Sequence, residues 1–293
     1  MFFYPWRIAS LKLPESGSFF CSSGGRRLNT LRFGGVSLGD TSNAAPAPED
    51  DMETIEVDNI EDFLRLIKAR KAESTAAGNC EDFLFRGQVM DSPLLPKICR
   101  LRAKGDILET ERKLLSEFKR TNPLLIEQLR PMDDWDYLTL GQHFGLPTRL
   151  LDWTNNALTA LWFATSNIDT YIPVAGDHAI VWLLMAERED FNLDLETTHP
   201  FDVAQTKLIR PRIIKQRINN QSGVFSVLST SDLEEKRFMN ESDSYNRKLV
   251  KIKIPEASFA DIRNDLNTVG VNAFTIFPEL EGLCSYLQWR YFD

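Results

Sequence analysis

The chain has 293 residues, enough to bury one large hydrophobic core or two small ones. Its 34 basic and 42 acidic residues give a formal net charge of -8, which argues against nucleic-acid binding over the whole surface but not against a local basic groove. The four scattered cysteines and three histidines argue against a disulfide framework and a zinc site. No apolar run comes near the ~20 residues that cross a bilayer, which argues against a membrane partner. We therefore expect a cytoplasmic protein without a metal site.

The first fifty residues differ in composition from the rest. Residues 1–39 hold five basic residues and one acidic residue, and a stretch of Ala and Pro follows at residues 44–48. Three interpretations are open, namely a transit peptide, a disordered tail, or sequence upstream of a true start at Met52, and we favour the last two. We therefore predict a tail over residues 1–50 and one folded domain over residues 51–293.

Apolar residues with helical spacing mark the first part of the folded region. They predict helices over residues 58–72, 106–121, 135–144 and 155–166. Asp58 is the predicted N-cap of the first helix, and Thr154 or Asn155 is the predicted N-cap of the last.

Short apolar or alternating runs mark strands. They predict strands over residues 82–87, 179–184, 223–228 and 249–254. Pro255 then opens a predicted helix with an apolar face from Phe259 to Val269, and Gly270 follows its end. Because the helices come before most strands, the pattern predicts an α+β fold, as a single compact domain with a mixed or antiparallel sheet and N-terminal helices.

Arg86 stands at the end of an apolar strand and directly before Gly87. A guanidinium in this place is costly to bury unless an anion meets it. Two interpretations compete: an internal pair with a carboxylate such as Asp152, or a planar fork that holds a phosphate or pyrophosphate. We expect Asp152 to pair with Arg86 or Arg149 in a buried network.

A second polar cluster runs from Gln142 to Thr154, with polar side chains placed between apolar ones. A glycine and a proline predict a turn in its middle, so that His143 closes one helix while the residues from Asp152 onward cap the next. The turn would bring His143 near Asp152, and we weigh a structural role for this histidine against a functional one.

These blocks resemble the FRG domain, a family named after its Phe-Arg-Gly tripeptide and found mostly in bacteria and their phages. The blocks that carry the resemblance lie at residues 85–88, 94–100, 142–154, 160–164, 217–225 and 277–282, within a similarity that spans about residues 55–290. The candidate ligand-binding residues are Arg86, Gly87, Gln142, Arg149, Asp152, Thr154, Arg217 and Gln221. One departure is that the acidic residues of the last block are glutamates here, where the family often has Asp.

The first functional hypothesis is an enzyme of the ADP-ribosyltransferase type that uses NAD. Arg86 and a Trp-Thr step leading into a helix are similar to features of that superfamily, and so is the acidic pair of the last block. The candidate catalytic residues are His143, Glu279 and Glu281. After Pro278, however, the two glutamates are expected in the first turn of a helix, where the helix dipole favours acids without any catalytic role.

Two other hypotheses belong to different classes. One is a non-catalytic module that binds a nucleotide or single-stranded nucleic acid through the basic run from Lys207 to Arg217, a run that is otherwise a solvated surface. The other is a regulatory domain that binds a protein target, for example in phage defence or a toxin system. In the ligand-binding hypotheses, we expect Arg86 and His143 to contact one phosphate-bearing ligand, either NAD or another nucleotide.

Overall fold

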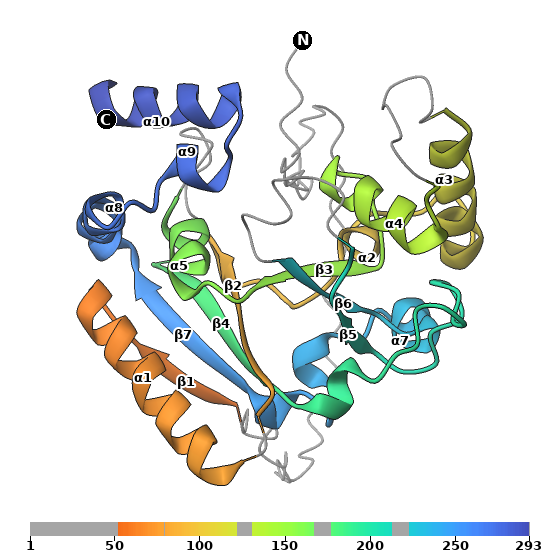
Figure 1. The fold of residues 1–293 in the computed structure, drawn as a ribbon, viewed down its shortest axis with the longest axis horizontal. Helices are drawn as coiled ribbons and strands as arrows, with labels where there is room; N and C mark the ends of the chain where they lie inside the picture. Colours follow the sequence, from red (N-terminus) through yellow and green to blue (C-terminus); the bar gives the residue numbers. More distant parts are fainter. Residues whose placement is uncertain (1–51, 79, 122–130, 167–176, 213–222, 293) are drawn as a thin grey trace, which may run out of the picture. The chain divides into compact units, whose positions relative to one another are not determined.

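The computed structural model describes residues 52–78, 80–121, 131–166, 177–212 and 223–292. Contacts divide the chain into Met1–Asp50 and Asp51–Asp293, and all described residues belong to the second unit (Figure 1). The tail predicted over residues 1–50 lies outside the described residues. Within the described ranges, no helix combines the length and the apolar character that crossing a membrane requires.

Seven strands of the described residues form one sheet in the order β1-β7-β4-β2-β3-β6-β5 (Figure 1). The strands are β1 (Glu53–Glu56), β2 (Asp82–Gln88), β3 (Leu150–Thr154), β4 (His178–Ala186), β5 (Lys207–Ile209), β6 (Gly223–Val227) and β7 (Leu249–Pro255). β1 and β7 run parallel, whereas the other neighbouring strands run antiparallel. The predicted α+β fold with a mixed sheet is confirmed.

Helices and short 3-10 turns are distributed along the whole chain. The helices are α1 (Ile60–Ala77), α2 (Lys97–Arg100), α3 (Ile107–Thr121), α4 (Asp134–His143), α5 (Ala157–Thr165), α7 (Thr230–Glu235), α8 (Phe259–Thr268), α9 (Ala273–Ile276) and α10 (Leu280–Phe292). The 3-10 turns are η2 (Arg188–Phe191), η3 (Met239–Glu241), η4 (Asn246–Lys248) and η5 (Glu256–Ser258). β1, β2 and β3 alternate with the first helices, whereas β4, β5, β6 and β7 all follow α5, in agreement with helices that come before most strands.

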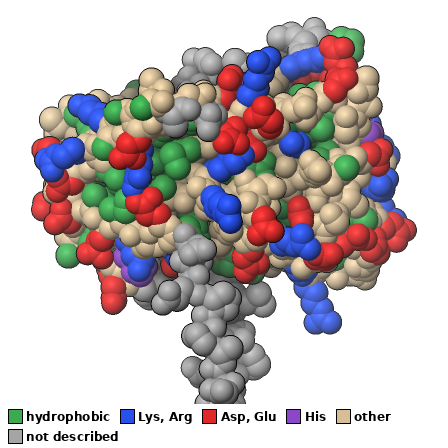
Figure 2. Space-filling view, turned by 90° about the horizontal axis from the view of Figure 1, so that it is seen from below, with side chains coloured by type: hydrophobic (Ala, Val, Ile, Leu, Met, Phe, Trp, Pro, Cys, Tyr) green, Lys and Arg blue, Asp and Glu red, His purple; other side chains and the backbone are tan. Residues whose placement is uncertain are grey.

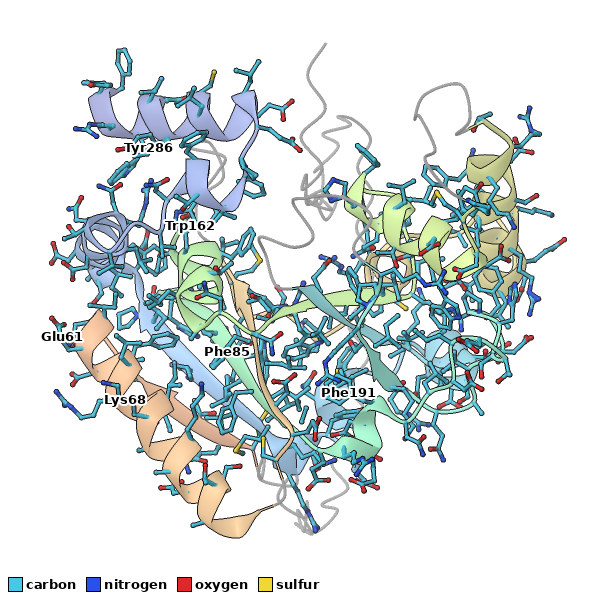
Figure 3. The ribbon with its side chains drawn as sticks, viewed as in Figure 1. Glu61, Lys68, Phe85, Trp162, Phe191 and Tyr286 are labelled. Carbon is cyan, nitrogen blue, oxygen red and sulfur yellow. The ribbon has the colours of Figure 1, made fainter. Side chains whose placement is uncertain are left out.

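The sheet is covered on both faces where β4 crosses its middle. Val181 of β4 belongs to a hydrophobic cluster that includes Phe63 of α1 and Ala160 of α5, whereas Trp182 belongs to a cluster on the opposite face. Successive side chains of a strand point to opposite faces, so a strand buried on both sides has a continuous apolar sequence. Figure 3 shows α1 on the first of these faces, near Phe85 of β2.

The helix starts lie one residue or more away from their predicted positions. Asn59 caps α1 in place of Asp58, because the Asn59 side chain accepts a backbone N–H from the first turn. Asn156 caps α5 in place of Thr154 or Asn155, and it accepts two backbone N–H groups.

The helix predicted after Pro255 begins later than expected. Pro255 ends β7, and η5 at Glu256–Ser258 comes before α8. Ile262 and Leu266 are buried as predicted, but Val269 follows the helix and is 58% exposed. The apolar face of α8 is therefore one turn shorter than its sequence pattern indicates.

Gly87 allows α5 to pack directly against β2. A Cβ atom built on Gly87 would lie 1.9 Å from the carbonyl oxygen of Ala160 and 2.7 Å from the backbone nitrogen of Ala164. Both atoms belong to the backbone of α5, which cannot move aside as a flexible side chain can. The glycine of the tripeptide therefore has a packing role, since it permits a close approach of two backbones.

We expect Gly87→Ala to lower the free energy of unfolding by about 1–3 kcal/mol, the usual cost of inserting a methyl group into a packed contact. Urea denaturation measures this change. Gly105→Ala is the matched control, because a Cβ atom at Gly105 meets no atom within 4 Å. If both variants unfold at the wild-type urea concentration, the packing role of Gly87 is refuted.

Candidate functional site

The two halves of the sheet meet at a narrow seam between β2 and β3. β2 pairs with β4 along its whole length from Asp82 to Gln88, and β3 pairs with β6 along its whole length. β2 and β3, however, share a single register pair, which is Phe85 with Thr154. Arg86 is the next residue of β2, so its side chain lies where the ladder between the two halves ends.

Arg86 bridges this seam with its guanidinium. Its Nη1 donates to the main-chain carbonyl oxygen of Asp152 at 2.9 Å and lies 3.9 Å from the carboxylate Oδ2 of the same residue. The Arg86 side chain is only 12% exposed. Its Nε is buried and has no hydrogen-bond partner among the described residues. The expected pairing of Asp152 with Arg86 is confirmed, yet the pairing leaves one buried donor unused.

Burial shifts the pKa of each partner in the direction that favours its neutral form. It lowers the pKa of Arg86 to about 10, against the attraction of Asp152 and together with repulsion from Arg100. It also raises the pKa of the Asp152 carboxyl, although Arg86 and a hydrogen bond from Gln142 act in the opposite direction. Arg86 still carries its positive charge at neutral pH. The seam therefore holds a charge whose compensation is incomplete.

Gln142 at the end of α4 orients the Asp152 carboxylate. Its Nε2 donates to Asp152 Oδ2 at 2.9 Å, and its Oε1 accepts from Thr148 Oγ1 at 2.6 Å. Thr148 is buried and its hydroxyl also accepts the backbone N–H of Leu150 at 3.2 Å. Hydrogen bonds thus run in series from Thr148 through Gln142 and Asp152 to Arg86.

β3 itself is a correction to the sequence analysis. The residues from Asp152 onward were expected to cap the next helix, but residues 150–154 form a strand. Leu151 and Trp153 point into one hydrophobic cluster, and Leu150 points into another. A strand of five residues whose polar positions also suit a helix cap gives too weak a periodicity to be recognised.

Arg149 uses its guanidinium donors in hydrogen bonds within the fold. It is 1% exposed, its Nε and Nη2 donate to the Glu111 carboxylate at 3.0 and 2.6 Å, and its Nη1 donates to the carbonyl oxygen of Leu228 at 3.4 Å. This two-point contact matches the planar fork of arginine to a carboxylate. The geometry therefore gives Arg149 a structural role.

Glu111 is a partner that sequence reasoning missed. It lies on α3 and is also 1% exposed. Its position follows Leu108 by three residues and precedes Leu115 by four, so it falls on the apolar face of that helix. A carboxylate in the middle of an apolar helix face was the sequence feature that could have indicated a buried ion pair.

His143 and Thr154 are close in sequence to members of this network, next to Gln142 and two residues after Asp152. His143 ends α4, is half-buried and packs its ring edge-on against Phe144 with 4.9 Å between centroids. Thr154 ends β3, is buried and accepts the backbone N–H of Asn156 at 3.1 Å. Gln142, rather than His143, supplies the described hydrogen bond to Asp152.

Glu279 and Glu281 lie where a new helix begins. Both glutamates are exposed, and Glu281 belongs to the first turn of α10 as predicted, whereas Glu279 comes just before the helix and not in its first turn. A Cβ atom built on Gly282 would lie 1.9 Å from the carbonyl oxygen of Phe277, so glycine lets α10 fold tightly back on the residues before it. The chain turns sharply from Phe277 to Gly282, and packing fixes this corner, which carries the two glutamates.

This corner is fastened to α5 by aromatic contacts. Phe277 packs edge-on against Trp162 at 5.8 Å and against Phe163 at 5.9 Å between ring centroids, and Figure 3 shows Trp162 between α5 and α9. α5 in turn contacts β2 at Gly87. Packing thus connects the corner to the strand that carries Arg86.

Two predicted site residues and part of the basic run cannot be placed. Arg217 and Gln221 lie outside the described residues, as does the end of the run that begins at Lys207. Within the described part, Arg210 pairs with Asp82 at 2.8 Å, and Arg212 with Asp133 at 3.2 Å. These arginines therefore have acidic partners in the fold. No group of His, Cys, Asp or Glu side chains among the described residues is suited to hold a metal ion.

Comparison with known proteins supports the resemblance to the FRG domain. The FRG domain family model matches residues 81–171. This stretch contains Arg86, the series from Gln142 to Asp152, and α5. No curated protein and no solved structure matches the chain.

We expect Glu111→Gln to lower the free energy of unfolding by about 3–5 kcal/mol, because it leaves the Arg149 charge buried without a counterion. Glu117→Gln is the control on the same helix, since Glu117 is 66% exposed and its pair with Arg120 lies on the surface. Urea denaturation compares the two variants. Similar losses for both would refute the structural role of the buried pair.

We expect Asp152→Ala to cost on the order of 3 kcal/mol of folding free energy, because Arg86 and Gln142 both lose a partner at the seam. Chemical denaturation of the variant and of wild type checks the value. A change within about 0.5 kcal/mol, the size of an ordinary surface substitution, would show that the carboxylate does not hold the seam together.

Proposed function

We propose that the FRG domain of this chain binds a phosphate-bearing nucleotide at the seam between β2 and β3, with NAD as the leading ligand. The observation that supports this proposal is the buried Nε of Arg86, which has no partner among the described residues. Buried donors almost always have a hydrogen-bond partner, and one that lacks it marks a place where a ligand can supply the acceptor. Phosphate oxygens suit this donor, because they accept from the planar fork of an arginine.

The contact with β3 prepares Arg86 for such a ligand. Nη1 is held by the carbonyl oxygen of Asp152, so the side chain is fixed before the ligand arrives. Nε lies on another edge of the planar fork and remains for phosphate oxygens. Gln142 holds the Asp152 carboxylate in place, which keeps this geometry. A preorganised donor loses less entropy on binding than a mobile one does.

Residues near the seam would recognise the rest of the nucleotide. His143 follows Gln142 at the end of α4 and would orient a ribose hydroxyl as donor or acceptor. Thr154 ends β3, two residues after Asp152. Arg217 would add positive potential from outside the described residues.

The reaction class proposed for this site is ADP-ribosyl transfer. The bond between nicotinamide and ribose breaks, and nicotinamide leaves with the bonding electrons. The ribose carbon accepts a lone pair from a nucleophile of the target or from water, which then loses its proton. A carboxylate near the ribose would stabilise the positive charge that develops. Glu279 and Glu281 are the candidates, presented at the fixed start of α10.

A non-catalytic nucleotide-binding module is the second candidate. It is favoured by the position of the two glutamates, because exposed acids at a helix start are explained by the helix dipole alone. Binding of single-stranded nucleic acid has less support, since Arg210 and Arg212 have acidic partners. Figure 2 also shows acidic and basic side chains interspersed on the face that it presents.

We expect Arg86→Lys to weaken NAD binding about tenfold or more while it changes unfolding much less, because lysine keeps the charge but loses the planar fork. Calorimetric titration with NAD, ATP and a short single strand measures binding. Arg65→Lys is the matched control, since Arg65 is exposed on α1. Release of nicotinamide from NAD then separates an enzyme from a binding module.

Two outcomes would refute the ligand site. In the first, wild type binds none of the three probes. In the second, Arg86→Lys binds as tightly as wild type, which would make Arg86 a structural partner of Asp152 and nothing more.

A further inference from the structure

Exposed apolar side chains gather toward the C-terminal end of the chain. Eight large hydrophobic side chains of the described residues are exposed, and six of them lie within residues 269–292. These six are Val269, Phe274, Leu280, Leu287, Tyr291 and Phe292. Single exposed apolar side chains are ordinary on a protein surface, whereas a concentration of them marks an interaction site. The region that contains α9 and α10 is therefore a candidate interaction surface.

α10 has apolar residues on both of its long sides. Its inner side packs on the fold, because Gly282 allows close contact with Phe277, and the ring centroid of Trp289 lies 5.5 Å from the guanidinium carbon of Arg263 on α8. A helix that is apolar all round is normally buried all round. Figure 3, however, shows side chains of α10 that point away from α9 and from the rest of the fold. The outer side of this helix is thus left to meet another molecule.

Four residues form a line along the outer side of α10. They are Leu280, Cys284, Leu287 and Tyr291, and all four are exposed. Steps of four, three and four residues separate them, so they lie on one face of the helix. The same spacing separates the core positions of a two-stranded coiled coil. We call these four residues the outer face of α10.

The outer face of α10 is complementary to itself. Its steps of four, three and four residues are the same in both directions along the helix. When a second copy of α10 lies antiparallel on the first, Leu280 meets Tyr291 of the second copy, and Cys284 meets Leu287 in the same register. A contact that uses one patch on both subunits is the isologous contact of a two-fold dimer. A second copy of this chain therefore fits the face along its whole length.

The charges of α10 favour the antiparallel orientation. Glu281 near the start and Arg290 near the end are the charged residues of this helix, and neither forms an ion pair within the part of the chain that the structure describes. The antiparallel register places the acidic start of each helix beside the basic end of the other. A parallel pair would place like charges side by side, which is unfavourable. With a single basic residue, α10 also lacks the cationic side of a helix that binds anionic membranes.

We propose that the outer face of α10 is the interface through which two copies of this chain associate as a two-fold dimer. This inference is independent of the proposed ligand site, because it uses none of the residues at the seam between β2 and β3. One helix of 13 residues per chain offers less area than the roughly 800 Å² per partner of a stable specific interface. We therefore expect a reversible dimer whose population depends on the concentration of the chain.

Sedimentation equilibrium of the full chain tests the dimer. We expect the average mass to rise with concentration from the 33.5 kDa of one chain toward twice that value. Leu287→Glu should raise the dissociation constant about tenfold or more, because it places a charge in the middle of the interface. Leu101→Glu is the matched control, since Leu101 follows α2 and is 39% exposed against 41% for Leu287. Leu280→Glu repeats the test at a side chain that is 79% exposed, where folding is least affected.

A cysteine pair tests the antiparallel register. In Leu287→Cys, each new thiol faces the native Cys284 of the second copy, so mild oxidation with diamide should link two chains much faster than it does in wild type. The control is Leu287→Cys combined with Cys284→Ser, which should lose this fast reaction. Electrophoresis without reductant measures the linked dimer.

Four results would overturn the proposal. Wild type with the mass of one chain at every concentration excludes the dimer. Equal dissociation constants in Leu287→Glu and Leu101→Glu place the interface elsewhere. Equally fast oxidation of wild type and Leu287→Cys excludes the antiparallel register. Binding of monomeric wild type to phosphatidylglycerol vesicles, if Leu287→Glu abolishes it, assigns the outer face of α10 to a membrane surface instead. Thermal melting verifies that each variant is folded.

Discussion

The hydrogen bond from Arg86 to the main-chain carbonyl of Asp152 bridges the two halves of the sheet where their backbone ladder ends. After the pair of Phe85 and Thr154, the ladder between β2 and β3 ends, and a side chain replaces the missing main-chain donor. A buried carbonyl needs such a donor. Gln142 supports the contact from α4, and Gly87 brings α5 against the strand that carries the arginine. Gln142 and Gly87 therefore both support the contact that Arg86 makes across the seam.

Two arginines of this fold, the buried Arg149 and the largely covered Arg86, differ in how completely the chain itself satisfies their hydrogen-bond donors. Arg149 meets a carboxylate with two nitrogens and a carbonyl with the third, so its burial is compensated within the chain. Arg86 uses one nitrogen and leaves Nε without an acceptor among the described residues. A buried donor in this state costs free energy that the fold does not recover. A bound anion would recover it, which is why the proposed site is placed at Arg86 and not at Arg149.

The sequence predicted those parts of the molecule that depend on local spacing. The helix from Ile107 to Thr121 and the strand from His178 to Ala186 follow from periodicity or from a continuous apolar run. β3 was missed, because its burial is decided by β6 and by clusters far away in the chain. The pairing of Glu111 with Arg149 was missed for the same reason, since 38 residues separate the partners. The polar residues of the seam were recognised as a group, whereas the partner of each one required the fold.

Two glycines explain how residues far apart in sequence come into close packing contact. Gly87 admits the backbone of α5 against β2, and Gly282 admits Phe277 against the first turn of α10. Phe277 then packs on Trp162 of α5, so contacts run without interruption from the seam to the two glutamates. Packing of this density leaves little freedom to the parts that it joins. The start of α10 and the strand that carries Arg86 are therefore connected through packing contacts with α5.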